Sequence, residues 1–292
     1  MFTIVKKRVV AENTKEIVVE APEVAGHARA GQFVILRNNE QGERYPLTIA
    51  DHDANAGTLT LVFLEIGKST HQLGLFEVGD EIPDLVGPLG NPTELGRHEQ
   101  AVVIGGGVGI AAAHPVAKAF KAAGKRVTAI IGAKNKDLLF YEEEMRAASD
   151  ELVVTTDDGS AGAKGFVTER LVEVIETLGA DQIGEVFAVG PSVMMRAVAE
   201  TTRPHGIRTI VSLNPIMVDG TGMCGGCRVE VGGETKFACV DGPDFDAHLV
   251  DFDLLIARQG MYKSVESQAA QECRLEADIA SKKDTPKTPD SQ

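Results

Sequence analysis

Apolar and polar residues alternate in short runs along the first third of the chain, a pattern that predicts β-strands with one buried face. The breaks between these runs contain glycine, asparagine, proline and aspartate, which favour turns. The predicted strands cover residues 3–10, 15–19, 32–36, 58–64 and 81–86. Several short strands at this spacing predict a small β-barrel or sandwich over residues 1–98.

From residue 99 onward the chain alternates apolar strands with helical segments. The predicted strands contain the sequences AVVIGG, VTAIIG, LVVTTDDG and EVFAVG. Helices are predicted up to residue 118, near 141–148, at 166–177 and after 190. Uninterrupted apolar strands that alternate with helices indicate a parallel sheet covered on both faces. Residues 99–212 are therefore expected to form an α/β domain of the nucleotide-binding type.

Glycine and cysteine dominate the segment that follows. Residues 218–242 hold seven glycines and three cysteines, which makes the stretch too irregular for a helix and too glycine-rich for a packed strand. A bound group is expected to organise this loop, within a segment that covers residues 213–262. Residues 263–292 are predicted to form a helix followed by a disordered tail.

Four residues of this loop have the spacing of metal ligands: Asp219-x4-Cys224-x2-Cys227-x11-Cys239. Plant-type [2Fe–2S] ferredoxins use C-x4-C-x2-C and a distant fourth cysteine. Here Asp219 takes the first position, and a carboxylate can bind iron although it is a harder donor than thiolate. The alternative is a structural zinc site completed by Asp219 or Cys273. We favour the cluster because such zinc sites pair two C-x2-C units, and expect Cys273 to be a free thiol.

A glycine-rich turn follows the first strand of the α/β domain. Gly107-x-Gly109-x-x-Ala112 fits the pattern G-x-G-x-x-G/A, in which a helix N-terminus faces a pyrophosphate. Tight packing between strand and helix is the alternative explanation for this turn alone. Two later turns also follow predicted strands, at the edge where open α/β sheets bind ligands. The candidate nucleotide-binding residues are Gly105, Gly106, Gly107, Val108, Gly109, Asp157, Asp158, Gly190 and Pro191.

The choice between NAD(H) and NADP(H) depends on charges near this site. The acidic residue usually expected at the end of the second strand is absent, and Lys134 and Lys136 there would attract a 2′-phosphate. Asp157 and Asp158 would repel it. The sequence favours NAD(H), with NADP(H) as the alternative.

Composition narrows the function further. With 29 Lys and Arg against 43 Asp and Glu, the formal charge is −14, which disfavours nucleic acid and anionic membranes as partners. Four cysteines are too few for a disulfide scaffold and fit a metal site in a reducing compartment. The N-terminus lacks a signal-peptide pattern, and the apolar run 101–113 is too short to span a bilayer. A cytoplasmic protein without membrane or nucleic-acid partners is expected.

Two motifs in the first domain become informative because they precede a nucleotide-binding domain. The first contains Arg44, Tyr45, Pro46, Leu47 and Thr48, which alone indicate a turn that enters a strand. The second contains Gly67, Lys68, Ser69 and Thr70, which alone indicate a turn that opens a helix. Their order before the glycine-rich turn and the cysteine loop distinguishes the chain from an ordinary α/β protein.

The whole arrangement resembles the ferredoxin–NADP reductase superfamily, over residues 1 to about 262. It is similar to the iron–sulfur flavoprotein subunits that accompany dihydroorotate dehydrogenase, and more so to the small subunits of NADH-dependent ferredoxin:NADP oxidoreductases, also called sulfide dehydrogenases. Aspartate at position 219 favours the latter, since the dihydroorotate-type subunits have cysteine there. The resemblance implies a β-barrel FAD-binding domain, then an α/β parallel-sheet nucleotide-binding domain and a C-terminal iron–sulfur loop.

The resemblance also implies which residues bind each cofactor. FAD would contact Arg44, Tyr45, Pro46, Leu47, Thr48, Val62, Phe63, Leu64, Gly67, Lys68, Ser69 and Thr70. A [2Fe–2S] cluster would be bound by Asp219, Cys224, Cys227 and Cys239. Hydride would pass between NAD(H) and FAD, and single electrons between FAD and the cluster, so no side chain is expected to act as acid or base.

A carrier of single electrons implies a partner that takes them. The expected partner is a larger iron–sulfur flavoprotein subunit in a heterodimer, which would reach ferredoxin indirectly and could bifurcate electrons. The alternatives are the electron-transfer subunit of a dihydroorotate dehydrogenase and, in a different class, a zinc-containing nucleotide-binding regulator.

Overall fold

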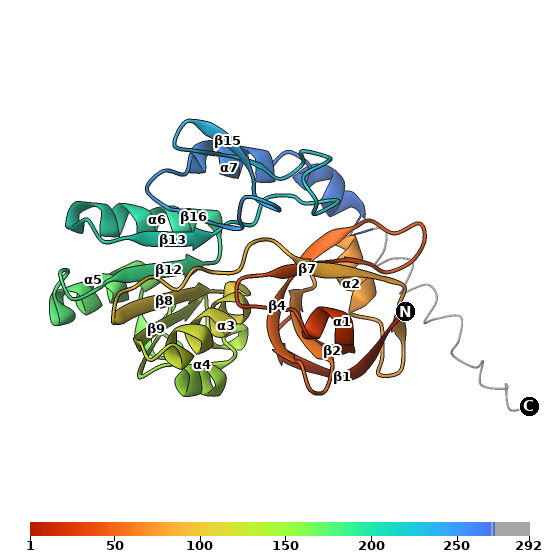
Figure 1. The fold of residues 1–292 in the computed structure, drawn as a ribbon, viewed down its shortest axis with the longest axis horizontal. Coiled ribbons are helices and arrows are strands. Elements are labelled where there is room, and N and C mark those ends of the chain that lie inside the picture. The colour runs from red at the N-terminus through yellow and green to blue at the C-terminus, as the bar shows by residue number, and fades with distance from the viewer. Residues whose placement is uncertain (270, 272–292) are drawn as a thin grey trace, which may run out of the picture.

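The computed structural model describes residues 1–269 and residue 271. They form two domains and a smaller C-terminal segment that follows them in the chain (Figure 1). The predicted tail from residue 272 onward, with Cys273, lies outside the described residues. None of the helices in the described part of the chain is long and apolar enough to cross a lipid bilayer.

The first domain is a nearly closed antiparallel barrel of seven strands in the order β6-β1-β2-β5-β4-β3-β7. Its strands are β1 (Phe2–Ala11), β2 (Thr14–Glu20), β3 (Phe33–Arg37), β4 (Tyr45–Asp53), β5 (Thr58–Leu64), β6 (Glu81–Ile82) and β7 (Asp84–Leu89). Two short helices, α1 (Pro22–Ala25) and α2 (Lys68–Leu73), accompany them. Alternate residues such as Leu36, Leu61 and Phe63 fill the barrel interior. The barrel prediction is confirmed.

The barrel has two strands more than predicted, because the predicted strand 81–86 divides into β6 and β7 and because β4 is absent from the predicted set. β4 pairs with β3 and β5, although it contains Pro46 and ends in the polar sequence Asp51-His52-Asp53. Proline lacks the N–H that a strand interior normally uses. The polar residues at the end of β4 also interrupt the alternation of apolar and polar residues that predicts a strand. The sequence therefore indicated only a turn that enters a strand.

The second domain is a seven-stranded sheet in the order β11-β10-β9-β8-β12-β13-β16. Its strands are β8 (Gln100–Gly106), β9 (Arg126–Ala133), β10 (Glu151–Thr156), β11 (Ala163–Lys164), β12 (Glu185–Val189), β13 (Thr209–Ser212) and β16 (Asp244–Asp246). All neighbours run parallel except β13 and β16. The predicted parallel sheet is confirmed, with one antiparallel edge strand that comes from the C-terminal segment.

Helices cover both faces of this sheet. They are α3 (Gly109–Ala122), α4 (Glu142–Ala148), α5 (Val167–Leu178) and α6 (Ser192–Thr202), with 3₁₀ turns at Lys136–Leu138 and Arg203–His205. On β8, Val103 packs with α3 and α4, whereas Val102 and Ile104 pack with α5 and α6. Successive strand residues face opposite sides of the sheet, and helices cover both sides. Residues on both faces are therefore buried, which explains the uninterrupted apolar runs in the sequence.

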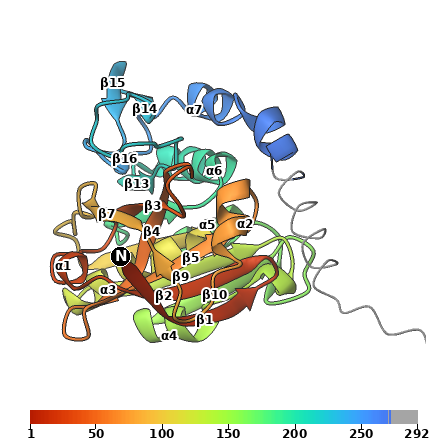
Figure 2. The ribbon, with the colours of Figure 1, turned by 90° about the vertical axis from the view of Figure 1, so that its right-hand side faces the viewer.

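The C-terminal segment contains more regular structure than expected. A hairpin of β14 (Arg228–Val231) and β15 (Glu234–Phe237) lies within the stretch predicted to be too glycine-rich for a packed strand, so that prediction is wrong. Gly232 and Gly233 have φ values of 63° and 78°, which suit a tight two-residue hairpin turn. The helix α7 (Phe252–Gln259) follows, and Figure 2 shows both elements beyond the β13–β16 edge of the sheet.

A partly buried polar network joins the barrel to the α/β domain. The Glu16 carboxylate on β2 accepts two bonds of 2.7 Å from the Arg8 guanidinium and one of 2.5 Å from the Tyr141 hydroxyl. Burial raises the pKa of Glu16, but these hydrogen bonds outweigh burial and hold it below its ordinary value. Tyr141 has a φ of 61°, a strained conformation for a bulky residue that its surroundings must maintain.

We predict that Tyr141→Phe lowers the free energy of unfolding by about 1.5–3 kcal/mol, because a buried carboxylate loses a hydrogen bond. Denaturant unfolding would measure the change, with Tyr262→Phe as control because Tyr262 is 52% exposed. The Glu16 pKa is depressed in the folded protein, so its stabilisation exists above the ordinary carboxyl pKa of about 4 and is lost as pH falls. An equal loss in both variants at neutral pH would contradict the prediction.

Candidate functional site

The glycine-rich turn lies where the α/β sheet changes its direction of winding. From β8 the chain moves to β9 on one side, and later to β12 on the other, so the carboxyl ends of β8 and β12 mark the point at which open α/β sheets bind ligands in a crevice. The two turns at these ends touch, since a Cβ on Gly109 would lie 2.5 Å from the carbonyl oxygen of Val189. The structure thus brings Gly105–Gly109 together with Gly190 and Pro191.

Space for a ligand exists on the outer side of this turn. Gly107 has a φ of 55°, and a Cβ there would meet no atom within 4 Å. Its N–H donates to the carbonyl of Gly132 at 2.8 Å, which fixes the turn against β9. The helix α3 begins at Gly109, so its positive N-terminal end faces this side, as a pyrophosphate site requires.

Asp157 and Asp158 lie farther away, at the end of β10, which β9 separates from β8. Their backbone N–H groups donate to the carbonyls of Ala133 and Lys134, at 3.1 and 3.3 Å. Hydrogen bonds from the hydroxyl and N–H of Ser160 hold the pKa of Asp158 below its usual value. A carboxylate from β10 therefore stands beside the end of β9, where the sequence alone showed no acid.

The two flavin motifs of the barrel are joined by a residue that the sequence did not single out. The Tyr45 hydroxyl, at the start of β4, donates to Oδ1 of Asn38 at 2.6 Å, and Asn38 Nδ2 donates to the carbonyl of Ser69 at 2.7 Å. Burial raises the pKa of Tyr45. Asn38 is itself buried directly after an apolar strand, which was its only signal in the sequence.

The remaining flavin candidates take different positions. Gly67 caps α2 through Thr70, and a Cβ on Gly67 would meet no atom within 4 Å, so this turn has an open side. Val62 packs at the boundary with the α/β domain, whereas Phe63 fills the barrel interior. Arg44 is exposed and forms no ion pair within residues 1–269, which leaves its guanidinium available for a phosphate.

Two of the cluster candidates form a buried pair. The sulfur atoms of Cys227 and Cys239 are 3.2 Å apart, and both residues are almost completely buried. Burial, with the neighbouring thiol, raises the pKa of Cys239 to about 12. Without a bound cation the Cys239 thiol therefore stays protonated, and iron would supply the positive charge that its thiolate requires.

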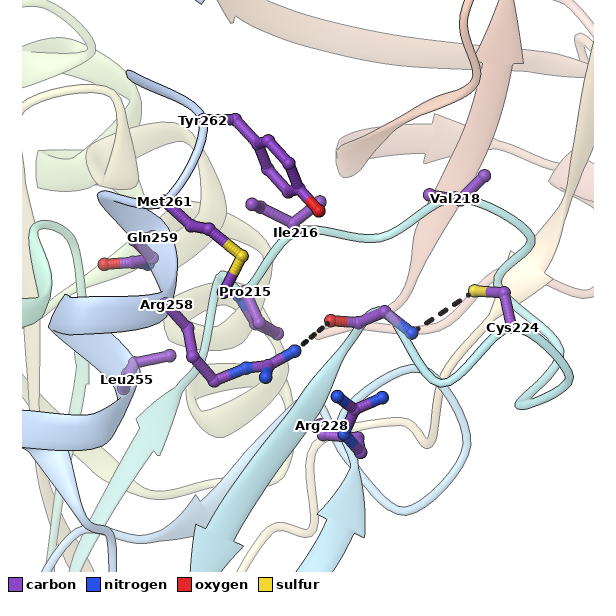
Figure 3. Close-up of a pocket in the computed structure, with 11 residues that line it drawn as sticks. Pro215, Ile216, Val218, Cys224, Arg228, Leu255, Arg258, Gln259, Met261 and Tyr262 are labelled. Atoms are coloured by element: carbon purple, nitrogen blue, oxygen red, sulfur yellow. Dashed lines mark hydrogen bonds between the residues drawn. The ribbon is translucent and has the colours of Figure 1, made fainter. Parts of the chain in front are cut away.

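The other two candidates form a second pair at the exposed end of the loop. The carboxylate of Asp219 accepts hydrogen bonds from the N–H of Thr221 at 3.0 Å and of Cys224 at 2.7 Å, and these bonds lower its pKa. Cys224 is exposed, and its sulfur accepts a bond of 3.4 Å from the N–H of Gly226 (Figure 3). An ionised carboxylate is thus held beside the first cysteine.

This arrangement fits a two-iron cluster better than a single ion. Among the described residues, no three His, Cys, Asp or Glu side chains are close enough to bind one metal ion. A tetrahedral zinc site needs four donors around one point. A [2Fe–2S] cluster needs two pairs of donors, one for each iron, and the loop supplies a buried and an exposed pair.

The cluster loop packs directly on the flavin barrel. A Cβ on Gly220 would lie 2.7 Å from Leu89 of β7 and 2.9 Å from Ile35 of β3, and Ile35 is paired across the sheet with Pro46 of the flavin motif. Gly220 has a φ of 74°, so both its conformation and its contact require glycine. The cluster candidates therefore lie against the strand that neighbours the flavin candidates.

Comparison with known proteins identifies the type of two segments of the chain. Residues 103–200 match the oxidoreductase NAD-binding domain. Residues 214–251 match the iron–sulfur cluster binding domain of dihydroorotate dehydrogenase B. The predicted nucleotide-binding domain and the choice of iron–sulfur over zinc are confirmed.

Some relatives match nearly the whole chain and not only single domains. A Thermotoga maritima protein, described as a homologue of the electron transfer subunit of dihydroorotate dehydrogenase B (NAD(+)), is 48% identical over 90% of this chain and 92% of its own. The dihydroorotate dehydrogenase B electron transfer subunit of Geobacillus kaustophilus is 35% identical over 84% and 96%. A chain from the structure of an NADH-dependent reduced ferredoxin-NADP oxidoreductase, reported with insights into flavin-based electron bifurcation, superposes with a TM-score of 0.87. It is 44% identical, and the match covers 94% of this chain and 98% of that one. The chain therefore belongs to the family of dihydroorotate dehydrogenase B electron transfer subunits and their homologues, with the ferredoxin reductase-like fold.

Proposed function

We propose that this chain carries FAD and a [2Fe–2S] cluster and transfers electrons between NAD(H) and a larger iron–sulfur flavoprotein subunit, in a cytoplasmic enzyme of the ferredoxin:NADP oxidoreductase type. The observation that carries the proposal is the packing of the cluster loop on Ile35, the strand partner of Pro46 in the flavin motif. The proposed nucleotide site, the strands that contact the flavin and the cluster loop then lie next to one another.

Within this arrangement the protein's own residues bind the nucleotide and orient the segments that contact the flavin. The Gly105–Gly109 turn and the N-terminus of α3 hold the nucleotide pyrophosphate, and the turn at Gly190 limits the crevice. Tyr45, Asn38 and Ser69 fix the two flavin segments relative to each other. When bound, FAD supplies the chemistry that exchanges a hydride for single electrons, and the cluster supplies a one-electron carrier.

Two observations favour the ferredoxin:NADP oxidoreductase type over a dihydroorotate dehydrogenase subunit. Identity is 44% to the structure of the former type and 35% to the Geobacillus subunit of the latter, and the 48% identical Thermotoga protein is described only as a homologue of such a subunit. In addition, Asp219 replaces the cysteine of the dihydroorotate-type loop.

The larger subunit is proposed to dock on the face that presents Cys224. This cysteine is exposed, whereas Cys227 and Cys239 are buried, so electrons leave most directly past it. Exposed apolar side chains surround it, among them Met223, which is 86% exposed, and Met261, which is 57% exposed. Apolar groups gathered on a soluble surface mark an interaction site.

Spectroscopy of the purified chain under anaerobic conditions tests the proposal. Flavin absorbance that NADH bleaches, with iron and sulfide in equal amounts, is the expected result. Size-exclusion chromatography after co-expression then separates the two types: a complex with a large iron–sulfur flavoprotein subunit is expected, and one with a dihydroorotate-oxidising subunit would overturn the choice. A colourless protein that contains zinc would overturn the function itself.

Nucleotide preference gives a second prediction. Asp158→Asn is expected to improve kcat/KM for NADPH relative to NADH about tenfold, because a like charge near the 2′-phosphate is removed. The exposed Glu176→Gln is the matched control, since it removes one negative charge far from the crevice. Unchanged preference in steady-state assays with a dye acceptor would place the ribose elsewhere than at the β9–β10 edge.

A further inference from the structure

One peptide group links an arginine to the exposed cluster candidate. The Arg228 guanidinium donates to the carbonyl of Gly225 at 2.7 Å, and the N–H of the same peptide group, on Gly226, donates to the sulfur of Cys224 at 3.4 Å. Hydrogen bonds in series polarise one another, so the cation strengthens the N–H donor that faces the sulfur. Arg228 thus acts on Cys224 without contact between their side chains.

A second arginine reaches the next carbonyl from a different element. Arg258, in the last turn of α7, donates to the carbonyl of Gly226 at 3.2 Å (Figure 3). Two guanidinium groups therefore bind consecutive carbonyls between Cys224 and Cys227. Neither of them forms an ion pair with a carboxylate in the part of the chain that the structure describes. Their charges are not neutralised locally, in a chain whose net charge is −14.

The surroundings strengthen this electrostatic effect. Both arginines line a cavity of about 290 Å³ beside Cys224, whose other walls include the apolar residues Pro215, Ile216 and Leu255. Apolar walls lower the local dielectric around the partly buried Arg258, whose charge acts more strongly there than in bulk water, whereas Arg228 is exposed. Figure 3 shows the Arg258 side chain directed from α7 toward the cluster loop.

We propose that Arg228 and Arg258 are positioning residues that raise the reduction potential of the iron–sulfur cluster. The inference rests on the proposed function, since it requires a cluster bound through Cys224. Reduction adds one negative charge to the cluster, and hydrogen bonds and cations near the ligand sulfurs stabilise that charge. The arginines also offset the destabilising effect of the anionic Asp219 on the same loop.

Redox titration with dithionite and mediators, followed by the EPR signal of the reduced cluster, tests this assignment without NADH. Arg228→Gln is expected to lower the reduced-to-oxidised ratio at a fixed solution potential about tenfold, which equals about 59 mV for a one-electron couple. Arg258→Gln is expected to lower it in the same direction. Arg228→Lys, which keeps the charge, should retain most of the wild-type potential.

Arg146→Gln is the matched control, because Arg146 is an exposed arginine on α4, on the opposite face of the sheet. The cluster of this variant should have the same reduction potential as the cluster of the wild type. Equal potentials in wild type, Arg228→Gln and Arg258→Gln would overturn the inference and leave the proposed function intact. A shift of the same size in Arg146→Gln would also overturn it, because net charge alone would then be responsible. A wild-type chain without a cluster signal would overturn both.

Discussion

Cys227→Ser is expected to leave the chain almost without iron, with retention at least about 100-fold weaker than in the wild type. Cys227 is buried with its sulfur 3.2 Å from Cys239, so its loss removes one donor of the buried pair and leaves the other without a partner. Serine oxygen is a harder and weaker ligand for iron than thiolate. Iron and sulfide analysis with EPR would measure the loss, while bleaching of the flavin by NADH should persist.

Cys273→Ser is the matched control, since it makes the same chemical change at the cysteine outside the ligand motif. The cluster signal of this variant should equal that of the wild type. Loss of metal in Cys273→Ser, together with zinc in the wild type, would support the zinc alternative. Retention of a normal cluster in Cys227→Ser would contradict the assignment of the buried pair.

Gly109→Ala is expected to slow the reduction of FAD by NADH about 10- to 100-fold. A Cβ at this position would lie 2.5 Å from the carbonyl oxygen of Val189 and 2.8 Å from Cα of Gly190, both of them backbone atoms that cannot rotate away. The two turns that form the crevice must then separate, at a cost of about 1–3 kcal/mol. Stopped-flow measurement of flavin absorbance at several NADH concentrations would show whether binding, hydride transfer or both are impaired.

Gly124→Ala separates this clash from a general effect of glycine replacement. Gly124 follows α3, has a φ of 77° and has no atom within 4 Å of an added Cβ. Alanine there strains the backbone but leaves the crevice unchanged, so normal flavin reduction is expected. If both variants reduced flavin at the same rate, contact between the two turns would not determine nucleotide binding.

Local patterns were sufficient for the elements that have a strong period or a special turn. Four of the five predicted barrel strands and the strands that begin at β8 have uninterrupted or alternating apolar residues and are present in the fold, whereas the predicted strand 81–86 divides into β6 and β7 at opposite ends of the sheet order. The cysteine spacing identified a loop in which the four candidates form two pairs. Short motifs of this kind depend on residue type and spacing alone, so they can be recognised without knowledge of tertiary contacts.

Other features depend on contacts between distant parts of the chain. β16 has only three residues and exists because β13 offers it an edge, which no local pattern reveals. Asn38 joins the flavin motifs only because β4 and α2 meet beside it. Arg258 reaches the cluster loop from a helix that begins more than ten residues after Cys239. The hairpin at Gly232 and Gly233 could have been predicted, since two adjacent glycines between alternating residues are a recognised hairpin signal.

The contact of Gly220 with Ile35 and Leu89 limits how this protein can be engineered. A reductase that lacks the iron–sulfur segment exposes the corresponding barrel surface to solvent, whereas here Ile35 and Leu89 lie against Gly220 of the segment. Grafting the segment onto such a reductase would therefore require apolar residues at the matching positions of β3 and β7. Deleting it from this chain would expose both side chains and also remove β16, which would leave β13 as an unpaired edge of the α/β sheet. The electron-carrying segment is thus an inseparable part of the flavin domain's own surface, and chimeras should exchange the two together.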